Sequence, residues 1–170
     1  PKDTSAMRDF SRRAGARLRM VEAAIDANEA QHQIAVKKVL AALDGRGKRT
    51  AAILGLSYKP DTDDLREAPS LFLIRALLRK GISIRVYDPA VRADAAGLPR
   101  GLHFAQNPYD AVKGADVMVL VTEWNEFRRL DLARVKRAMR RKAIVDLRNV
   151  YDPATVQRLG FDYTSVGRPA

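Results

Sequence analysis

The chain of 170 residues contains no cysteine, which excludes disulfide bonds and thiolate metal sites. Its only histidines, His32 and His103, lie far apart and show no ligand spacing, so we expect no metal site. No stretch approaches the roughly 20 apolar residues of a membrane-spanning helix, and the start shows no signal-peptide pattern. A cytoplasmic protein that does not enter a membrane is therefore expected.

A glycine-rich phosphate loop is also missing. Gly55 stands alone after an apolar run, and no G-x-G-x-x-G or Walker lysine motif follows it. The turn that normally brings a pyrophosphate onto a helix N-terminus is therefore absent. We expect that this chain does not hold a dinucleotide in the usual way.

Positive charge is in excess, with 31 Lys and Arg against 20 Asp and Glu, a net charge of +11. This balance is compatible with nucleic acid, acidic lipid or a phosphorylated small molecule as partner. Aromatic residues make up only 6%, and the basic residues are scattered over several predicted helices. The pattern favours a basic solvated surface and no nucleic-acid partner, with a basic nucleic-acid-binding module as the alternative. A purely structural dimerisation domain is a third interpretation.

Helical signals dominate the first part of the chain. Thr4 is a candidate N-cap for a helix that runs to about Ala14, before Gly15. A longer helix is predicted over Leu18–Leu43, because apolar residues recur at steps of three and four. The breaker DGRGKR follows it at residues 44–49. We therefore divide the chain into a helical segment, residues 1–46, and a domain, residues 47–170.

Strands and helices alternate in the second part, which predicts an α/β fold with a parallel sheet covered on both faces. The predicted strands are residues 50–56, 82–88, 116–122, 143–147 and 161–166. The predicted helices are residues 69–80, 91–97, 108–115, 131–140 and 153–160. Ligands of such sheets bind beyond the carboxyl ends of the strands. This rule selects the loops at residues 57–68, 88–91, 122–127 and 146–151.

The loop at residues 57–68 is the most charged of these. Lys59, next to Tyr58, is placed to meet a phosphate or carboxylate, while the ring can lie against a base or sugar. The loop's aspartates are expected to cap turns and to hold Lys59 and Arg66, with Asp64-x-x-Glu67 resembling a capping box. The alternative is a well-capped loop with surface ion pairs only.

Two further loops carry candidate ligand contacts. Trp124 follows the strongest strand and is expected to pack over the sheet edge or to form a pocket wall. Arg148 follows another strand end and can make a forked contact to a ligand oxygen. A salt bridge from Arg148 to Asp146 or Asp152 is the structural alternative.

The segments GLSYKPDTDDLREAPS, VYDP, TEW and DLRN, taken in order, resemble the C-terminal domain of the UDP-glucose/GDP-mannose dehydrogenase family. PKD and ANEAQ resemble the segment before that domain, so the resemblance covers essentially the whole chain. It implies a Rossmann-like doubly wound parallel sheet preceded by a long helix. In this family an N-terminal domain binds NAD, a C-terminal domain binds the sugar nucleotide, and a sugar C6 alcohol is oxidised to a carboxylate in two steps through a cysteine-bound intermediate.

Carried over residue by residue, the resemblance assigns catalytic roles to Lys2 and Asp3, which match the end of the motif that contains the nucleophilic cysteine. The chain starts at Pro1, so we expect that cysteine just upstream and the NAD domain outside this chain. The complete protein is expected to be an NAD-dependent UDP-sugar dehydrogenase. The chain alone is expected to be inactive, because no other side chain here replaces the thiolate.

The same resemblance assigns substrate binding to Tyr58, Lys59 and Arg148, and contact with NAD to Arg66. It predicts a homodimer through the helix around Leu18–Leu43. Among the substrates of the family, UDP-glucose, which is oxidised to UDP-glucuronate, is the one that the sequence DDLRE at residues 63–67 fits best. UDP-N-acetylmannosamine and GDP-mannose stay open as alternatives.

Overall fold

A six-stranded, all-parallel sheet forms the centre of the molecule in the computed structural model. The structure describes residues 2–43, 45 and 47–168, apart from the side chains of residues 2, 3 and 5. Along the sheet the strand order is β3-β2-β1-β4-β5-β6. The strands are β1 Thr50–Leu54, β2 Ser83–Tyr87, β3 Leu102–Phe104, β4 Val117–Leu120, β5 Ala143–Asp146 and β6 Asp162–Ser165.

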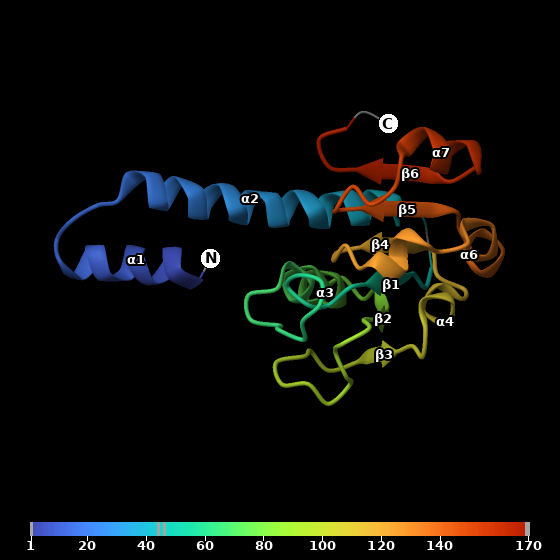
Figure 1. The fold of residues 1–170 in the computed structure, drawn as a ribbon, viewed down its shortest axis with the longest axis horizontal. Coiled ribbons are helices and arrows are strands. Elements are labelled where there is room, and N and C mark those ends of the chain that lie inside the picture. The colour runs from blue at the N-terminus through green and yellow to red at the C-terminus, as the bar shows by residue number, and fades with distance from the viewer. Residues whose placement is uncertain (1, 44, 46, 169–170) are drawn as a thin grey trace.

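Helices cover both faces of this sheet, as the alternating pattern predicts (Figure 1). One core cluster joins α2 and α3 to one set of strand residues, such as Ile53. The neighbouring residue Leu54 points to the other face, where α4, α5, α6 and α7 pack. The helices are α1 Lys2–Arg13, α2 Arg19–Ala42, α3 Pro69–Arg79, α4 Pro108–Val112, α5 Asn125–Arg128, α6 Leu132–Ala138 and α7 Pro153–Arg158.

The strand order reverses between β1 and β4, which lie side by side at the centre of the sheet. In a doubly wound sheet this switch point is where a crevice opens beyond the carboxyl ends. We call the four loops that leave β1, β2, β4 and β5 the carboxyl edge; they span residues 55–68, 88–91, 121–127 and 147–151. In Figure 1 the strand arrows point towards the projecting α1–α2 hairpin, so this edge faces that arm.

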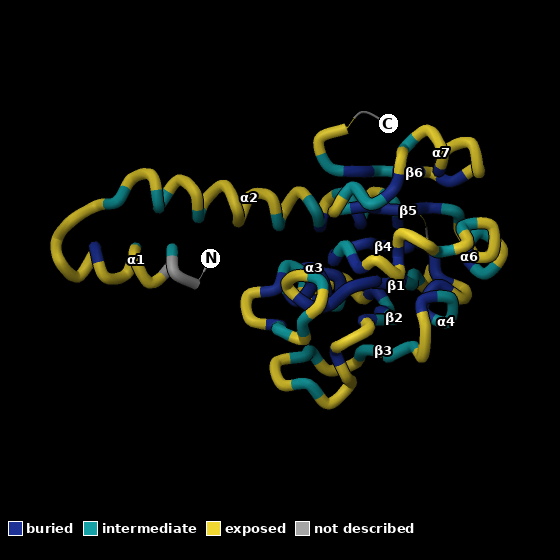
Figure 2. Tube along the Cα trace, in the orientation of Figure 1, coloured by how far each residue is buried: buried dark blue, intermediate teal, exposed yellow. Residues whose placement is uncertain are grey.

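Helix α2 belongs to the sheet domain at its C-terminal end and to the arm at its N-terminal end. Val36, Val39 and Leu43 are buried in the core cluster of α3, whereas Met20 is 88% exposed. Figure 2 shows the same change, from an exposed arm to a buried centre. No helix of the described residues is long and apolar enough to cross a membrane.

Two local predictions are corrected by the structure, and two short elements were not predicted. Thr4 lies inside α1 and does not cap it, because the helix begins at Lys2. Residues 91–97 form no helix; the Asp88 side chain instead accepts hydrogen bonds from the Ala90 and Val91 amides and turns the chain. Strand β3 and helix α5 were not predicted, since elements of three and four residues show no measurable periodicity.

Candidate functional site at the carboxyl edge

Asp88, at the end of β2, holds the start of the β1 loop. Its buried Oδ2 accepts hydrogen bonds from the backbone amides of Leu56 and Ser57 at 2.7 and 3.0 Å. The hydroxyl of Ser57 donates to the same oxygen at 3.1 Å, and the indole Nε1 of Trp124 donates to it at 3.3 Å. Trp124 is therefore packed over the sheet edge, the first of the two arrangements expected for it.

The switch point itself is closed by the protein's own atoms. Gly55 has a φ of +91°, and a Cβ there would lie 2.5 Å from the Cβ of Thr122. Thr122 Oγ1 donates a hydrogen bond to the Ser57 carbonyl at 2.6 Å, which ties the β4 loop to the β1 loop. Glu67 lies just before α3, where an acidic side chain disfavours a bound phosphate. These residues do not fit a dinucleotide pyrophosphate at the switch point.

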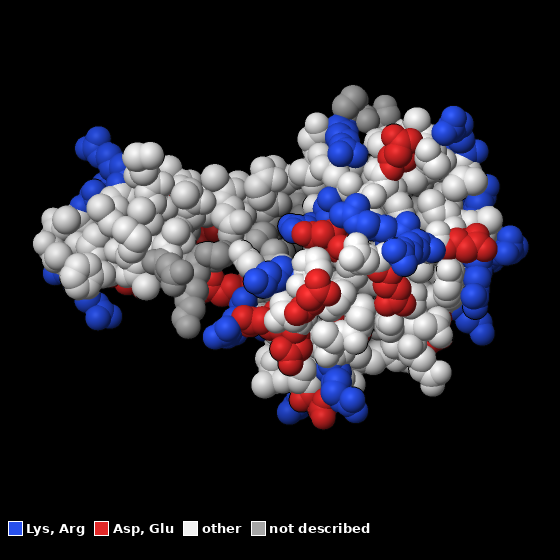
Figure 3. All heavy atoms as spheres, in the orientation of Figure 1, with Lys and Arg blue, Asp and Glu red and all other residues white. Residues whose placement is uncertain are grey.

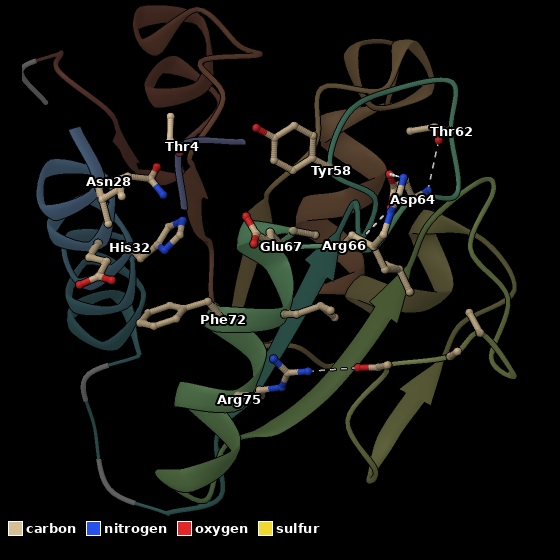
Figure 4. Close-up of a pocket in the computed structure, with 18 of the residues that line it drawn as sticks. Thr4, Asn28, His32, Tyr58, Thr62, Asp64, Arg66, Glu67, Phe72 and Arg75 are labelled. Carbon is tan, nitrogen blue, oxygen red and sulfur yellow. Dashed lines mark hydrogen bonds and ion pairs between the residues drawn. The ribbon is translucent and has the colours of Figure 1, made fainter. Parts of the chain in front are cut away.

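A groove of about 1460 Å³ lies beside this edge, between α2 on one side and the β1 loop with α3 on the other. Figure 4 shows Asn28 and His32 of α2 facing Tyr58 and Glu67 across it. The His32 ring packs against the Phe72 ring, with 5.0 Å between their centroids. Burial lowers the pKa of His32, although the nearby Glu29 acts against that shift.

Arg66 lies on the groove side of the β1 loop and is paired with Asp64. The Asp64 carboxylate accepts hydrogen bonds from the Arg66 amide at 2.9 Å and from its guanidinium Nε and Nη2 at 2.8 and 2.6 Å. The expectation that Asp64 orients Arg66 is thus met by direct contacts. The predicted capping box is wrong, because Ala68 is the N-cap residue of α3 and makes no side-chain capping bond. Asp64 instead forms a local turn with Arg66.

Lys59 is exposed and makes no hydrogen bond or ion pair with the described residues, so the loop's aspartates do not hold it as expected. The β1 loop around it has unusual backbone geometry, with positive φ at Asp61 and Glu67. Asn149 of the β5 loop has a φ of +54° as well, and these are the non-glycine residues with positive φ in the described chain. Strained backbone of this kind often marks functional loops.

Arg148 of the β5 loop pairs with Glu123 of the β4 loop. Its Nε contacts Oε2 of that carboxylate, and its Nη2 donates to Oε1 at 2.7 Å. The contact with Glu123 raises the pKa of the Arg148 guanidinium, with a smaller contribution from the nearby Tyr58. The hydrogen bond from Arg148 in turn holds the pKa of the Glu123 carboxyl below its ordinary value. The alternative interpretation, an ion pair of Arg148 with Asp146 or Asp152, is not observed, because the guanidinium pairs with Glu123 instead.

Asp146 does not pair with the guanidinium but fixes the backbone of the same loop. Its fully buried carboxylate accepts hydrogen bonds from the Arg148 amide at 3.0 Å, the Tyr151 amide at 3.0 Å and the Tyr163 hydroxyl at 2.8 Å. The side-chain amide of Asn149 bonds to the backbone N–H and C=O of residue 166. The loop that carries Arg148 is therefore fixed from two sides.

The predicted residues thus share one edge but not one cavity. Tyr58 and Arg66 line the groove, while Lys59 and Arg148 are not among its lining residues. Figure 3 shows acidic and basic side chains mixed over the face of the domain next to the arm. Asp88 and Glu123 were not named as site residues; each is an acid at the end of a strand, in VYD and VTE, which was the available signal.

Two further expectations concern the start of the chain and metals. Lys2 and Asp3 belong to α1, but their side chains lie outside the described residues. Within the described part, no group of three or more His, Cys, Asp or Glu side chains is arranged to hold a metal ion.

Comparison with known proteins identifies similar sequences along almost the whole chain. The sequence model described as UDP-glucose/GDP-mannose dehydrogenase family, UDP binding domain, matches residues 52–153. The chain is 41% identical over 171 residues to a UDP-glucose 6-dehydrogenase of Rhizobium meliloti and 42% identical over 176 residues to one of Pseudomonas aeruginosa. Each match covers 99% of this chain and 39% of the relative.

Solved structures give the same picture of the fold. A UDP-glucose dehydrogenase from Pyrobaculum islandicum matches 98% of this chain and 36% of its own with a TM-score of 0.78 at 27% identity. A UDP-D-ManNAc dehydrogenase from Pyrococcus horikoshii matches 87% of this chain and 33% of its own with a TM-score of 0.71 at 29% identity. The chain therefore spans between a third and two fifths of the length of these proteins.

Proposed function

This chain belongs to the UDP-glucose/GDP-mannose dehydrogenase family, and from that premise we propose that its carboxyl edge binds the UDP part of a UDP-sugar. The observation that carries the proposal is that the β1 and β5 loops both leave the sheet at this edge, where Arg148, with a side chain 40% exposed, provides a positive charge and Tyr58 provides an exposed aromatic ring. Lys59, exposed on the same β1 loop, supplies a second positive charge without a partner among the described residues. Two cations beside an aromatic ring suit a nucleoside diphosphate.

In the complete protein this edge would hold the substrate of an NAD-dependent oxidation of the sugar C6 alcohol. We propose UDP-glucose as that sugar nucleotide, because the two curated relatives described above are named UDP-glucose 6-dehydrogenases. UDP-N-acetylmannosamine and GDP-mannose are the alternatives. Lys2 and Asp3 would take part in the chemistry, and Arg66, whose side chain is 74% exposed, would contact NAD held mainly outside this chain.

The chain by itself would bind without catalysing, since it has no cysteine to carry the intermediate. We further propose that two copies associate through the α1–α2 arm. Met7, Phe10, Met20 and Ile34 of that arm are exposed apolar side chains, and a second copy would remove them from water. The cytoplasmic location and the absence of a nucleic-acid partner stay predictions.

Titration calorimetry with UDP tests the binding role of Lys59. Replacing Lys59 with alanine removes a charge-assisted contact to the diphosphate, so we expect affinity to fall about tenfold. Lys113→Ala is the matched control, because it removes the same charge after α4, at the opposite edge of the sheet. Equal UDP affinity of the wild type and Lys59→Ala would show that Lys59 is not part of the site.

A further inference from the structure

The β4 loop connects the other three loops of the carboxyl edge through consecutive residues. Thr122 donates its hydroxyl hydrogen bond to the Ser57 carbonyl of the β1 loop. Trp124 donates from its indole to Asp88 at the end of β2. The residue between them, Glu123, reaches the β5 loop. Because its two neighbours are fastened, the backbone that carries Glu123 has a defined position.

The contact that Glu123 makes uses one side of the Arg148 guanidinium. Nε and Nη2 point to the two carboxylate oxygens. A guanidinium has five N–H groups in a fixed plane, so this contact leaves both hydrogens of Nη1 and one of Nη2 without a carboxylate partner. The side chains of Arg148 and Glu123 are 40% and 27% exposed, so the ion pair is partly open to solvent.

Glu123 has two opposing effects on an anionic ligand. Its negative charge repels a diphosphate and competes for Arg148. Its forked contact also removes the rotational freedom of a long side chain, which a ligand would otherwise have to restrict on binding. Glu123 favours binding only if the second effect exceeds the first, and the titrations below measure which of the two is larger.

We propose that Glu123 is a positioning residue that holds Arg148 in the orientation in which it receives the diphosphate of the sugar nucleotide. This inference rests on the proposed function, and it assigns a role to an acidic residue at the edge of an anion site. It predicts that removal of a negative charge weakens the binding of a negatively charged ligand, the opposite of the simple electrostatic expectation.

Titration calorimetry of UDP against this chain separates the two effects. We expect Glu123→Ala to bind UDP about tenfold more weakly than the wild type. Glu123→Asp keeps the charge and recovers most of the affinity, since a long arginine side chain reaches the shorter acid. Glu126→Ala is the matched control: it removes a carboxylate of the same segment that contacts Tyr87 and not Arg148. Its affinity for UDP stays equal to that of the wild type or rises slightly.

A double substitution tests whether Glu123 acts through Arg148. In an Arg148→Ala background, the added Glu123→Ala change causes no further loss of affinity for UDP, and relief of the unpaired carboxylate's repulsion raises the affinity slightly. Should Glu123→Ala fail to fold, Glu123→Gln keeps the shape but removes the charge and one of the two contacts to Arg148, and a smaller loss in the same direction is expected. A merely structural role would weaken binding equally in both backgrounds.

The outcomes separate this inference from the proposed function. If the wild type binds no UDP, the proposed function fails and the inference fails with it. If the wild type binds UDP and Glu123→Ala binds it equally or more tightly, only the positioning role is overturned. An equal loss in the wild-type and Arg148→Ala backgrounds also overturns it.

Discussion

Gly55 occupies a position where the structure leaves no space for a side chain. It directly follows β1 at the switch point and has a φ of +91°. A Cβ at this residue would lie 2.5 Å from Thr122 Cβ and 2.6 Å from the Thr122 backbone nitrogen. Both atoms belong to the β4 loop, which is tied to Ser57 and Asp88. The loop therefore has little freedom to move away from a new methyl group.

The substitution Gly55→Ala combines two costs. A positive φ costs a residue with a Cβ about 1–2 kcal/mol. Forcing a methyl group into packed atoms costs a further ~1–3 kcal/mol. We therefore expect the free energy of unfolding to fall by about 2–5 kcal/mol, a large part of the total of a typical domain.

Gly101→Ala is the matched control, because Gly101 has a φ of +85° and no atom lies within 4 Å of the place that its new methyl group would take. It carries the backbone cost alone, about 1–2 kcal/mol. Urea unfolding of both variants, followed by circular dichroism at one pH, measures the difference. Equal destabilisation of the two variants would refute the claim that Thr122 closes the switch point. A stability of Gly55→Ala equal to that of the wild type would refute it as well.

Two other predictions address the pH dependence and the boundary of the core. Burial, together with the Glu126 carboxylate, raises the pKa of Tyr87 from 10.0 to about 12. The contribution of the neutral Tyr87 side chain to stability is therefore complete below pH 10 and is lost as the pH rises from 10 towards 12. Urea unfolding at pH 9 and at about pH 11 should therefore show a smaller loss of stability in Tyr87→Phe than in the wild type, and equal losses would contradict this. Leu43 is fully buried, so Leu43→Ala should cost about 2–5 kcal/mol of unfolding free energy, whereas Met20→Ala, at an 88% exposed residue, should change it by less than about 0.5 kcal/mol. Similar costs would mean that α2 does not enter the sheet core at Leu43.

The general architecture was predictable because its signals are local and repeated. The apolar runs that form β1, β4 and β5 are bounded by polar loops, and parallel strands with helices between them have few possible arrangements. Charged residues after these strands pointed to the carboxyl edge for the same reason. Elements of one turn or three residues, such as α5 and β3, gave no such signal.

Partners within the site were harder to predict, because they depend on distances between segments far apart in the chain. Proximity along the chain suggested Asp146 or Asp152 as alternative ion-pair partners of Arg148. Asp146 accepts a hydrogen bond from the Arg148 backbone amide, but the guanidinium pairs with Glu123 of another loop. The aspartates of the β1 loop were expected to hold Lys59 and Arg66, and one of them, Asp64, pairs with Arg66 two positions away, because a turn brings such neighbours together. Adjacency along the chain is a guide only where the contact is local.

The sequence by itself determined the alternation of strands and helices, the absence of a thiolate and of a glycine-rich loop, and the edge on which charged residues gather. Tertiary structure decided that Thr122 fills the space beside Gly55, that Asp88 joins three loops and that Glu123 takes Arg148. The physical reason is that hydrophobic periodicity is written in consecutive residues, whereas a hydrogen bond forms only between atoms that the folded chain brings within about 3 Å.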